Sequence, residues 1–208
     1  MLKLQQVKKS YASQLILNVP ELNLPSGIIW IKGKNGSGKT TLMKIIAGQI
    51  PSEGSVALYD ISLISDPLAY RKQISYAEAE PLYPGFLTGT ELLKFVQKVR
   101  KADTQLLKEV IDVWNIGGFI DNRIETYSSG MLKKLSLAMA FLGKTKLILL
   151  DEPLITLEDV ALPILFQLVR DRVKEGTSFI ITSHQAFPEH ELKLTSTLMV
   201  ENQTARIE

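Results

Sequence analysis

The amino-acid sequence predicts an α/β fold with a block of helices inserted between its two halves. Three observations predict this fold. The apolar stretch GIIWIKG runs through a glycine-rich turn into a segment with helical spacing, TTLMKIIAG. Between about residues 82 and 143, helical patterns follow one another with no strand pattern between them. Strand patterns then return in KLILLD and TSFIIT, so the two α/β halves should share one largely parallel sheet.

The first half of the chain consists mostly of predicted strands. LKLQQV and QLILNV precede GIIWIKG, and EGSVAL and ISYA are predicted as further short strands. The helix TTLMKIIAG is expected to end at Gly48, because glycine readily takes the left-handed conformation that ends helices.

The helical block is expected to hold three helices. Thr88 and Glu91 have the spacing of a capping box at the start of the first helix, and the second covers roughly residues 103–115. The third opens in the stretch TYSSGMLKK, residues 126–134. Its apolar residues have the spacing of a packed helix face: Leu132, Leu135, Ala138, Met139 and Leu142.

The second half begins with KLILLD and continues with a helix over residues 159–175, the strand TSFIIT and short strands near the C-terminus. We therefore expect a single domain over residues 1–208. Its α/β core should comprise residues 1–81 and 144–208, and its helical subdomain residues 82–143.

Composition limits the possible functions. The chain has 208 residues, of which 45% are apolar, and a net charge of +2, so binding to nucleic acid is not the default expectation. It has no cysteine, which excludes disulfides and thiolate metal sites. The first residues lack the apolar core of a signal peptide, and no apolar run reaches the roughly 18 residues of a spanning helix. We expect a soluble, cytoplasmic protein that works at a membrane only if another chain supplies the spanning segments.

The stretch GKNGSGKT, residues 33–40, fits the phosphate-binding pattern G-x-x-x-x-G-K-[ST] and lies between a predicted strand and a predicted helix, as that pattern requires. Gly33, Gly36 and Gly38 permit a close approach of backbone to phosphate. Lys39 is expected to meet the β- and γ-phosphates, and the Thr40 hydroxyl to bind Mg²⁺. These features predict ATP and Mg²⁺ as ligands. The remaining residues expected around the phosphates are Asn35, Ser37 and Thr41.

The stretch LILLDEP, residues 147–153, places two acids at the end of a buried strand. Asp151 would then lie beside the Mg²⁺ ion at the carboxyl edge of a parallel sheet, where ligands bind. Glu152 lies one residue further on, in a position to orient or deprotonate an attacking water molecule. A strand with two exposed acids at its end is the simpler interpretation of LILLDEP alone, but the phosphate-binding pattern makes it improbable.

These two motifs, with YSSGM between them, resemble the nucleotide-binding domain of the ABC transporter superfamily over nearly the whole chain. YSSGM resembles the family's LSGGQ-type signature: Ser128 and Gly130 agree with it, and Tyr127, Ser129 and Met131 are variants. The resemblance implies a P-loop NTPase (RecA-like) core with an antiparallel β subdomain and an inserted helical subdomain. It also implies ATP hydrolysis, with Glu152 and His184 as the catalytic residues.

The same resemblance implies further site residues. Tyr11 would stack on adenine, and His184 would be the switch histidine that touches the γ-phosphate. A tyrosine at a strand end or a lone histidine is more often structural, but their places in the family order favour the functional interpretation. His190 matches no motif and is expected at the surface. The signature of one subunit would face the ATP held by a second subunit, through residues Ser128, Ser129, Gly130 and Met131.

The sequence departs from the family pattern at two places. Ala79 stands where the family usually has a glutamine that senses Mg²⁺ and the attacking water. Glu78 or Glu80 would replace that glutamine after a small shift in register. The run LITLED also differs from the family's usual TSGLD-like run, so Glu158 replaces an expected aspartate. Both departures concern communication between subunits.

The resemblance implies an ATP-binding and ATP-hydrolysing subunit whose dimer closure drives transport through separate integral membrane subunits. It would be a homodimer, or a heterodimer with a similar ATPase subunit, held peripherally at the cytoplasmic face of the membrane by its partner. PLYPGFLTGTELLKF resembles the corresponding run of export ATPases. The alternative is a soluble, non-transport ABC ATPase with a role in translation, repair or regulation.

Two surface features bear on partners. Lys94, Lys98, Arg100 and Lys101 are interpreted as a solvated helix face, and no nucleic-acid partner is expected. The segment PLYPGFL contains two prolines and a glycine, which disfavour regular pairing, so it is predicted as a surface loop. An apolar surface loop favours docking to a membrane subunit, although its side chains could instead pack under the helical block. Those side chains are Leu82, Tyr83, Phe86 and Leu87.

Overall fold

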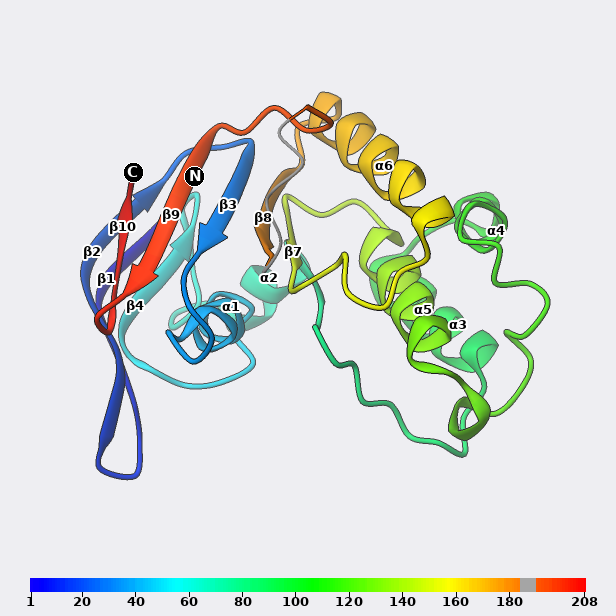
Figure 1. The fold of residues 1–208 in the computed structure, drawn as a ribbon, viewed down its shortest axis with the longest axis horizontal. Coiled ribbons are helices and arrows are strands. Elements are labelled where there is room, and N and C mark those ends of the chain that lie inside the picture. Colours follow the sequence, from blue (N-terminus) through cyan, green and yellow to red (C-terminus); the bar gives the residue numbers. More distant parts are fainter. Residues whose placement is uncertain (184–189) are drawn as a thin grey trace.

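The computed structural model describes residues 1–183 and 190–208, and two β-sheets frame this part of the chain (Figure 1). The larger sheet has six strands in the order β10-β9-β3-β8-β7-β6, and the smaller has four in the order β2-β1-β4-β5. The strands of the smaller sheet are β1 (Leu2–Tyr11), β2 (Gln14–Leu24), β4 (Glu53–Leu58) and β5 (Ile61–Ser62). Those of the larger sheet are β3 (Ile28–Lys32), β6 (Ile74–Ala77), β7 (Leu147–Leu150), β8 (Ser178–Thr182), β9 (Ser196–Glu201) and β10 (Thr204–Ile207).

Helices flank the larger sheet. Figure 1 shows α1 near the strands of the smaller sheet and α3 to α6 on the other side of the molecule. Between β6 and β7, where every residue is described, the regular elements are all helical. The α-helices are α1 (Lys39–Ile46), α2 (Pro67–Lys72), α3 (Gly89–Arg100), α4 (Thr104–Val113), α5 (Ser129–Phe141) and α6 (Leu162–Lys174). Short 3₁₀ turns are η1 (Ile124–Thr126) and η2 (Asp159–Ala161).

The centre of the larger sheet is parallel. β3 pairs with β8, β8 with β7 and β7 with β6, all in the same direction. Every residue of β7 and β8 is buried, as expected for strands covered on both faces. Because these strands run parallel, the loops that follow β3, β6, β7 and β8 all start at the same edge of the sheet. That edge is therefore the place where the predicted site residues can meet.

Two apolar cores lie on the two faces of the larger sheet. One contains buried residues of both sheets and of α1, among them Leu4, Ile31 and Ile45. The other contains buried residues of the larger sheet and the helical block. In it the ring centre of Phe141 lies 6.2 Å from that of Trp114 and 6.0 Å from that of Phe179. The cores fix α1 on one face and α5 on the other.

The structure confirms the predicted α/β class, and the differences have local causes. The helix predicted over 159–175 is divided into η2 and α6, because Pro163 lies in the first turn of α6, where its missing N–H costs nothing. The sequence reasoning missed α2, although Asp66 caps it through a 3.0 Å bond from the Ala69 N–H and Pro67 begins it. The capping box of Thr88 and Glu91 is confirmed. None of the helices in the described ranges has the length and apolarity needed to cross a membrane.

One expectation about the helical block is wrong. Arg100 does not belong to a solvated basic face, because its guanidinium is half-buried and donates to the carbonyl oxygens of Lys72 (2.8 Å) and Ile74. Burial lowers the pKa of Arg100. Its stem fills the space beside Gly143, which has a positive φ of 111°. Arg100 therefore links the end of α3 to the start of β6, whereas Lys94, Lys98 and Lys101 are exposed.

We predict that Arg100→Ala lowers the free energy of unfolding by about 2 kcal/mol, because two carbonyl groups lose charged hydrogen-bond donors. Urea denaturation of the purified domain measures the effect. Lys98→Ala is the matched control on the same helix, and it should change the free energy by less than about 0.5 kcal/mol. Equal effects of the two substitutions would show that Arg100 does not link the block to the sheet.

Candidate active site

The phosphate-binding loop joins β3 to α1. Gly38 caps α1 with a φ of +103°, in the left-handed region that favours glycine. At Gly33 a Cβ atom would lie 2.3 Å from the carbonyl oxygen of Val200, so only glycine fits against β9 at this point. These two positions explain why the loop can turn tightly from strand to helix. The N–H groups of the first turn of α1 have no acceptor within the helix and point toward the loop.

Lys39 is folded into this loop. Its side chain is buried, and Nζ donates to the carbonyl oxygens of Gly33 (2.8 Å) and Lys34 (3.1 Å). The Ser37 hydroxyl is buried and has no hydrogen-bond partner among the described residues. A buried ammonium group, a free hydroxyl and a helix N-terminus suit an anion with several oxygen atoms.

A pocket of ≈ 390 Å³ opens above the loop. It brings together residues that are far apart in the sequence but were predicted to act together. Tyr11 lies at its edge with 49% of its surface exposed, and Lys9 Nζ stands 5.0 Å from the centre of the Tyr11 ring. The pocket is lined by Tyr11, Ile16, Asn35, Gly36, Gly38, Lys39, Thr40, Thr41, Ala79, Glu80, Glu152 and Ile155. Gly33 and Ser37 belong to the loop but do not line the pocket.

Asp151 follows β7 at the carboxyl edge of the sheet and is almost fully buried. Its Oδ1 accepts a 2.6 Å hydrogen bond from the Thr182 hydroxyl, and its Oδ2 accepts a 3.0 Å bond from the Tyr76 hydroxyl. Burial raises the pKa of Tyr76, and the Asp151 carboxylate raises it further, so the phenol stays protonated and can donate. The two neighbouring strands thus hold both carboxylate oxygens in place.

Glu152 has a backbone φ of +47°, which is uncommon for a residue other than glycine. Its N–H donates to the Thr182 hydroxyl at 2.8 Å, so one hydroxyl group fixes both acids. The side chain is largely buried and lines the pocket. A strained backbone at the end of a strand is a frequent feature of catalytic positions.

The donor set suits Mg²⁺. The described residues contain no group of three or more carboxylate or histidine ligands that could hold a metal by themselves. Magnesium normally needs only one or two protein ligands, because phosphate and water oxygens complete its shell. The Thr40 hydroxyl lines the pocket, and the Asp151 carboxylate lies one residue before Glu152, which also lines it.

The three residues predicted to sense the nucleotide, Glu78, Ala79 and Glu80, follow β6 and do not all point in the same direction. Glu78 turns toward α1, where it lies 3.6 Å from Lys44 and accepts a 3.1 Å bond from Gln49. Ala79 and Glu80 line the pocket instead. Glu80 is therefore a better candidate than Glu78 for the sensing role that the resemblance gives to a glutamine.

Sequence reasoning missed Tyr76, Thr182 and Lys133. Lys133, on α5, is 1% exposed and donates to the carbonyl oxygens of Glu78 (3.1 Å), Ala79 (2.9 Å) and Asp151 (3.4 Å). Burial lowers its pKa to about 8, although the nearby carboxylates of Asp151, Glu152 and Glu80 oppose that shift. A signal was present in the sequence: a lysine at helical spacing from buried apolar residues of α5 cannot face water.

The signature residues lie outside this pocket. Ser128 caps α5 and accepts a 3.2 Å bond from the Met131 N–H, while its own N–H donates to the Met131 sulfur at 3.4 Å. Ser128 and Ser129 are exposed. Gly130 lies close to Thr156, whose carbonyl oxygen would be 3.2 Å from an added Cβ, a tight contact. Tyr127 is buried and donates to the Phe119 and Ile120 carbonyls, so the variant tyrosine anchors the signature.

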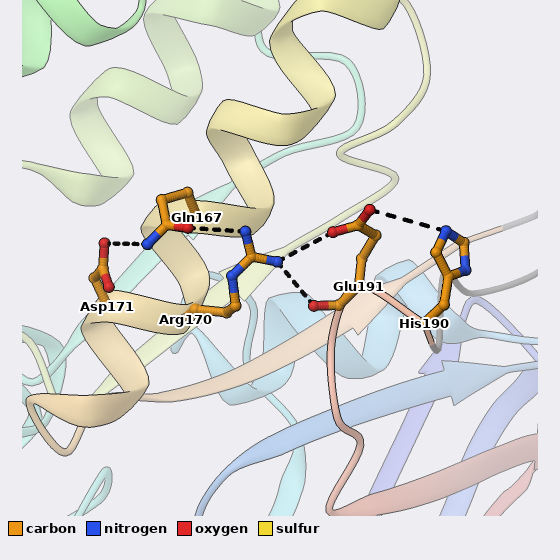
Figure 2. Close-up of polar contacts among 5 residues, drawn as sticks. All are labelled: Gln167, Arg170, Asp171, His190 and Glu191. Carbon is orange, nitrogen blue, oxygen red and sulfur yellow. Dashed lines mark hydrogen bonds and ion pairs between the residues drawn. The ribbon is translucent and has the colours of Figure 1, made fainter.

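The predicted switch residue His184 lies outside the described residues. His190 is exposed, as predicted. Figure 2 shows the contact between α6 and Glu191: Arg170 Nη1 donates to the carbonyl (3.0 Å) and the carboxylate (3.1 Å) of Glu191. Gln167 orients Arg170 by accepting from Nη2 at 2.9 Å, and in turn donates to Asp171.

Comparison with known proteins assigns the family. Residues 17–155 match the family described as "ABC transporter". The chain is 30% identical over 186 residues to the lantibiotic transport ATP-binding protein SrtF of Streptococcus pyogenes, covering 88% of this chain and 80% of that protein. It is 29% identical over 190 residues to the cytochrome c biogenesis ATP-binding export protein CcmA of Legionella pneumophila, and the match covers 90% of this chain and 94% of that protein. The chain belongs to the ABC transporter family.

A solved structure agrees in fold. It is a dimeric ATP-binding cassette determined in a post-hydrolysis state with ADP and phosphate. The match has a TM-score of 0.84 and a sequence identity of 21%, and it covers 100% of this chain and 98% of that chain. Within its family, the chain is the ATP-binding and ATP-hydrolysing subunit of a transporter. The findings do not support the alternative of a non-transport ABC ATPase.

Proposed function

We propose that two such subunits close around ATP at composite sites and thereby drive an export-type transporter through separate membrane subunits. One observation carries the proposal. Residues of the phosphate-binding loop and Glu152 line a single pocket, and Asp151 precedes Glu152 in the chain, whereas the signature residues lie outside that pocket. One relative is named as an export protein and another, 30% identical over 210 residues, as an import protein, so the proposed direction rests on the run PLYPGFLTGTELLKF, which resembles that of export ATPases.

Within one subunit, the loop binds the triphosphate. Lys39 leaves the carbonyls of Gly33 and Lys34 to meet the β- and γ-phosphates, while the first N–H groups of α1 bind the remaining oxygens. Tyr11, half exposed at the rim, stacks on adenine. Thr40 and Asp151 would hold Mg²⁺, which when bound neutralises charge on the transferring phosphoryl group.

Glu152 orients the attacking water and accepts its proton. Its burial keeps bulk water away from the carboxylate, and the Thr182 hydroxyl fixes its backbone beside Asp151. His184 assists at the γ-phosphate. Glu80, at the pocket wall, is the candidate for sensing the γ-phosphate, because the Ala79 side chain has no polar group.

The signature completes the site of the neighbouring subunit. The N-terminus of α5 carries no acidic residue in its first turn, and Ser128 and Ser129 expose their hydroxyls there. In a symmetric dimer each signature faces the other subunit's pocket, so binding of one ATP favours closure of both surfaces. A homodimer is the simplest assembly, and a heterodimer with a similar ATPase would use the same surfaces.

The membrane subunit docks at the loop between β6 and α3. Leu82 and Phe86 are 93% and 71% exposed, an unusual state for two large apolar side chains in one short loop. Tyr83 and Leu87, predicted to be exposed with them, pack against the core instead. Burial raises the pKa of Tyr83 to about 12. Through this contact the ATP-binding subunit would be held peripherally at the cytoplasmic face of the membrane.

The first test concerns Glu152. Glu152→Gln keeps the size of the side chain but removes the base, so we predict hydrolysis at least about 100-fold slower, with MgATP binding retained and an ATP-bound dimer accumulating. Phosphate release and size-exclusion chromatography measure both effects. As a contrast, Lys39→Ala should lose nucleotide binding itself. Near-normal turnover by Glu152→Gln would refute the proposed role.

The composite site is tested by Ser128→Arg. This substitution adds bulk and charge at the signature without touching the subunit's own pocket, so the monomer should bind ATP normally but lose ATP-dependent dimerisation and turnover. Ser65→Arg is the control, because Ser65 is also exposed but lies next to α2. If the monomer loses affinity for ATP, the signature acts within its own chain.

The docking surface is tested by the double substitution Leu82→Ser and Phe86→Ser. Loss of an aromatic anchor often costs about 2 kcal/mol, or roughly 30-fold in affinity, so recovery with the membrane subunit should fall while ATPase activity of the isolated domain is unchanged. Phe95→Ser is the control, since Phe95 is 65% exposed on α3 outside the loop. Undiminished recovery of the double variant would place the docking surface elsewhere.

A further inference from the structure

Lys133 is a buried cation with a complete set of acceptors. An ammonium group has three donors, and Lys133 has three carbonyl oxygens within hydrogen-bond distance. Two belong to Glu78 and Ala79 in the loop after β6, and the third to Asp151 after β7. One side chain of the signature helix therefore joins two of the segments that form the pocket.

Burying the Lys133 ammonium group removes it from water, and the cost in free energy must be offset by its hydrogen bonds. An apolar residue could fill the same position among the neighbouring buried residues Leu135, Ser136 and Leu137 without that cost, but it would leave the three carbonyl oxygens without this donor. The charge therefore serves the loop after β6 and the Asp151 carbonyl, and not the packing of α5 alone.

Among the described residues, the hydrogen bonds of Lys133 go to main-chain carbonyl oxygens. Ala79 lines the pocket but offers no polar side-chain atom, so the loop there is positioned through its carbonyl groups. Lys134, its neighbour on α5, differs: it pairs at 2.8 Å with Glu158, whose side chain is 66% exposed. Because Glu158 is well exposed, solvent screens this pair, and it contributes little to stability although the Lys134 side chain is only 16% exposed.

From these contacts we infer that Lys133 is a positioning residue for ATP hydrolysis. Its ammonium group fixes the loop at 78–79 against the Asp151 carbonyl and makes both move with α5. It does not touch the nucleotide. The inference rests on the proposed function, in which the N-terminus of α5 responds to the partner's ATP and Glu152 activates water. Lys133 then carries the movement of α5 to the acid pair of its own chain.

The first experiment compares Lys133→Met with Lys134→Met. Loss of positioning without loss of binding should lower kcat by about 10- to 100-fold and leave KM and the monomer's affinity for ATP within about threefold. Lys134→Met should leave kcat within about threefold of the unchanged protein. An unchanged kcat in Lys133→Met, or an equal loss in Lys134→Met, would overturn the inference.

A second variant separates charge from packing and guards against a fold defect. The chain has no cysteine, so Lys133→Cys offers a single thiol that can be alkylated in the unfolded protein before refolding. Alkylation with 2-bromoethylamine restores an ammonium group at nearly the original length, whereas 1-bromopropane gives a neutral chain of similar size. Only the aminoethylated protein should regain most of the lost kcat. Equal recovery with the propyl group would reduce Lys133 to a packing role.

Glu152→Gln, assayed in parallel, keeps this inference distinct from the proposed function. If Glu152→Gln is inactive while Lys133→Met turns over normally, only the role of Lys133 is refuted. If Glu152→Gln remains active, the proposed function fails, whatever Lys133→Met shows.

Discussion

The parallel pairing of β3, β8, β7 and β6 is the constraint on which the rest of the structure depends. It brings the phosphate-binding loop, the acid pair, the loop after β6 and the end of β8 to one edge, although they are spread over most of the chain (Figure 1). A shift of β7 by one residue would turn Asp151 from one face of the sheet to the other. β7 is apolar throughout and β8 is apolar between Ser178 and Thr182, with both strands buried on both faces. Their register is therefore fixed by backbone pairing and by the polar groups at the strand ends.

Thr182 shows how those polar groups work. Its hydroxyl accepts from the Glu152 N–H and donates to Asp151, so a single side chain on β8 helps to position both acids that follow β7. Tyr76 on β6 holds the other oxygen of Asp151 from the opposite side. With both oxygens engaged, Asp151 is held ready at the sheet edge, and a bound cation would have to compete with, or share, these two donors.

Sequence patterns predicted the α/β class, the position of the phosphate-binding loop and the acids after β7, because each follows from local rules of glycine conformation or strand ends. They could not predict the contacts of Tyr76, Thr182, Lys133 and Arg100, because those depend on which strands and helices become neighbours. Arg100 was misplaced for this reason: its charge suggests solvent, but the carbonyl groups of Lys72 and Ile74 are available to it only in the folded chain. The exposed and packed halves of the 82–87 loop likewise follow from tertiary contacts and not from composition.

The separation of signature and pocket gives α5 its mechanical importance. The N-terminus of α5 presents Ser128 to solvent, while Lys133, one turn further along the same helix, reaches the interior edge of the sheet. A helix of this length behaves as a rigid rod, so a displacement at one end is transmitted to the other with little loss. Ser128 and Lys133 are only five residues apart, at the same end of α5, so neither can move independently of the other. In the proposed dimer, closure against the neighbouring nucleotide and the arrangement of the acids in the same chain would both depend on the position of α5, so binding at the surface would be coupled to the buried catalytic edge.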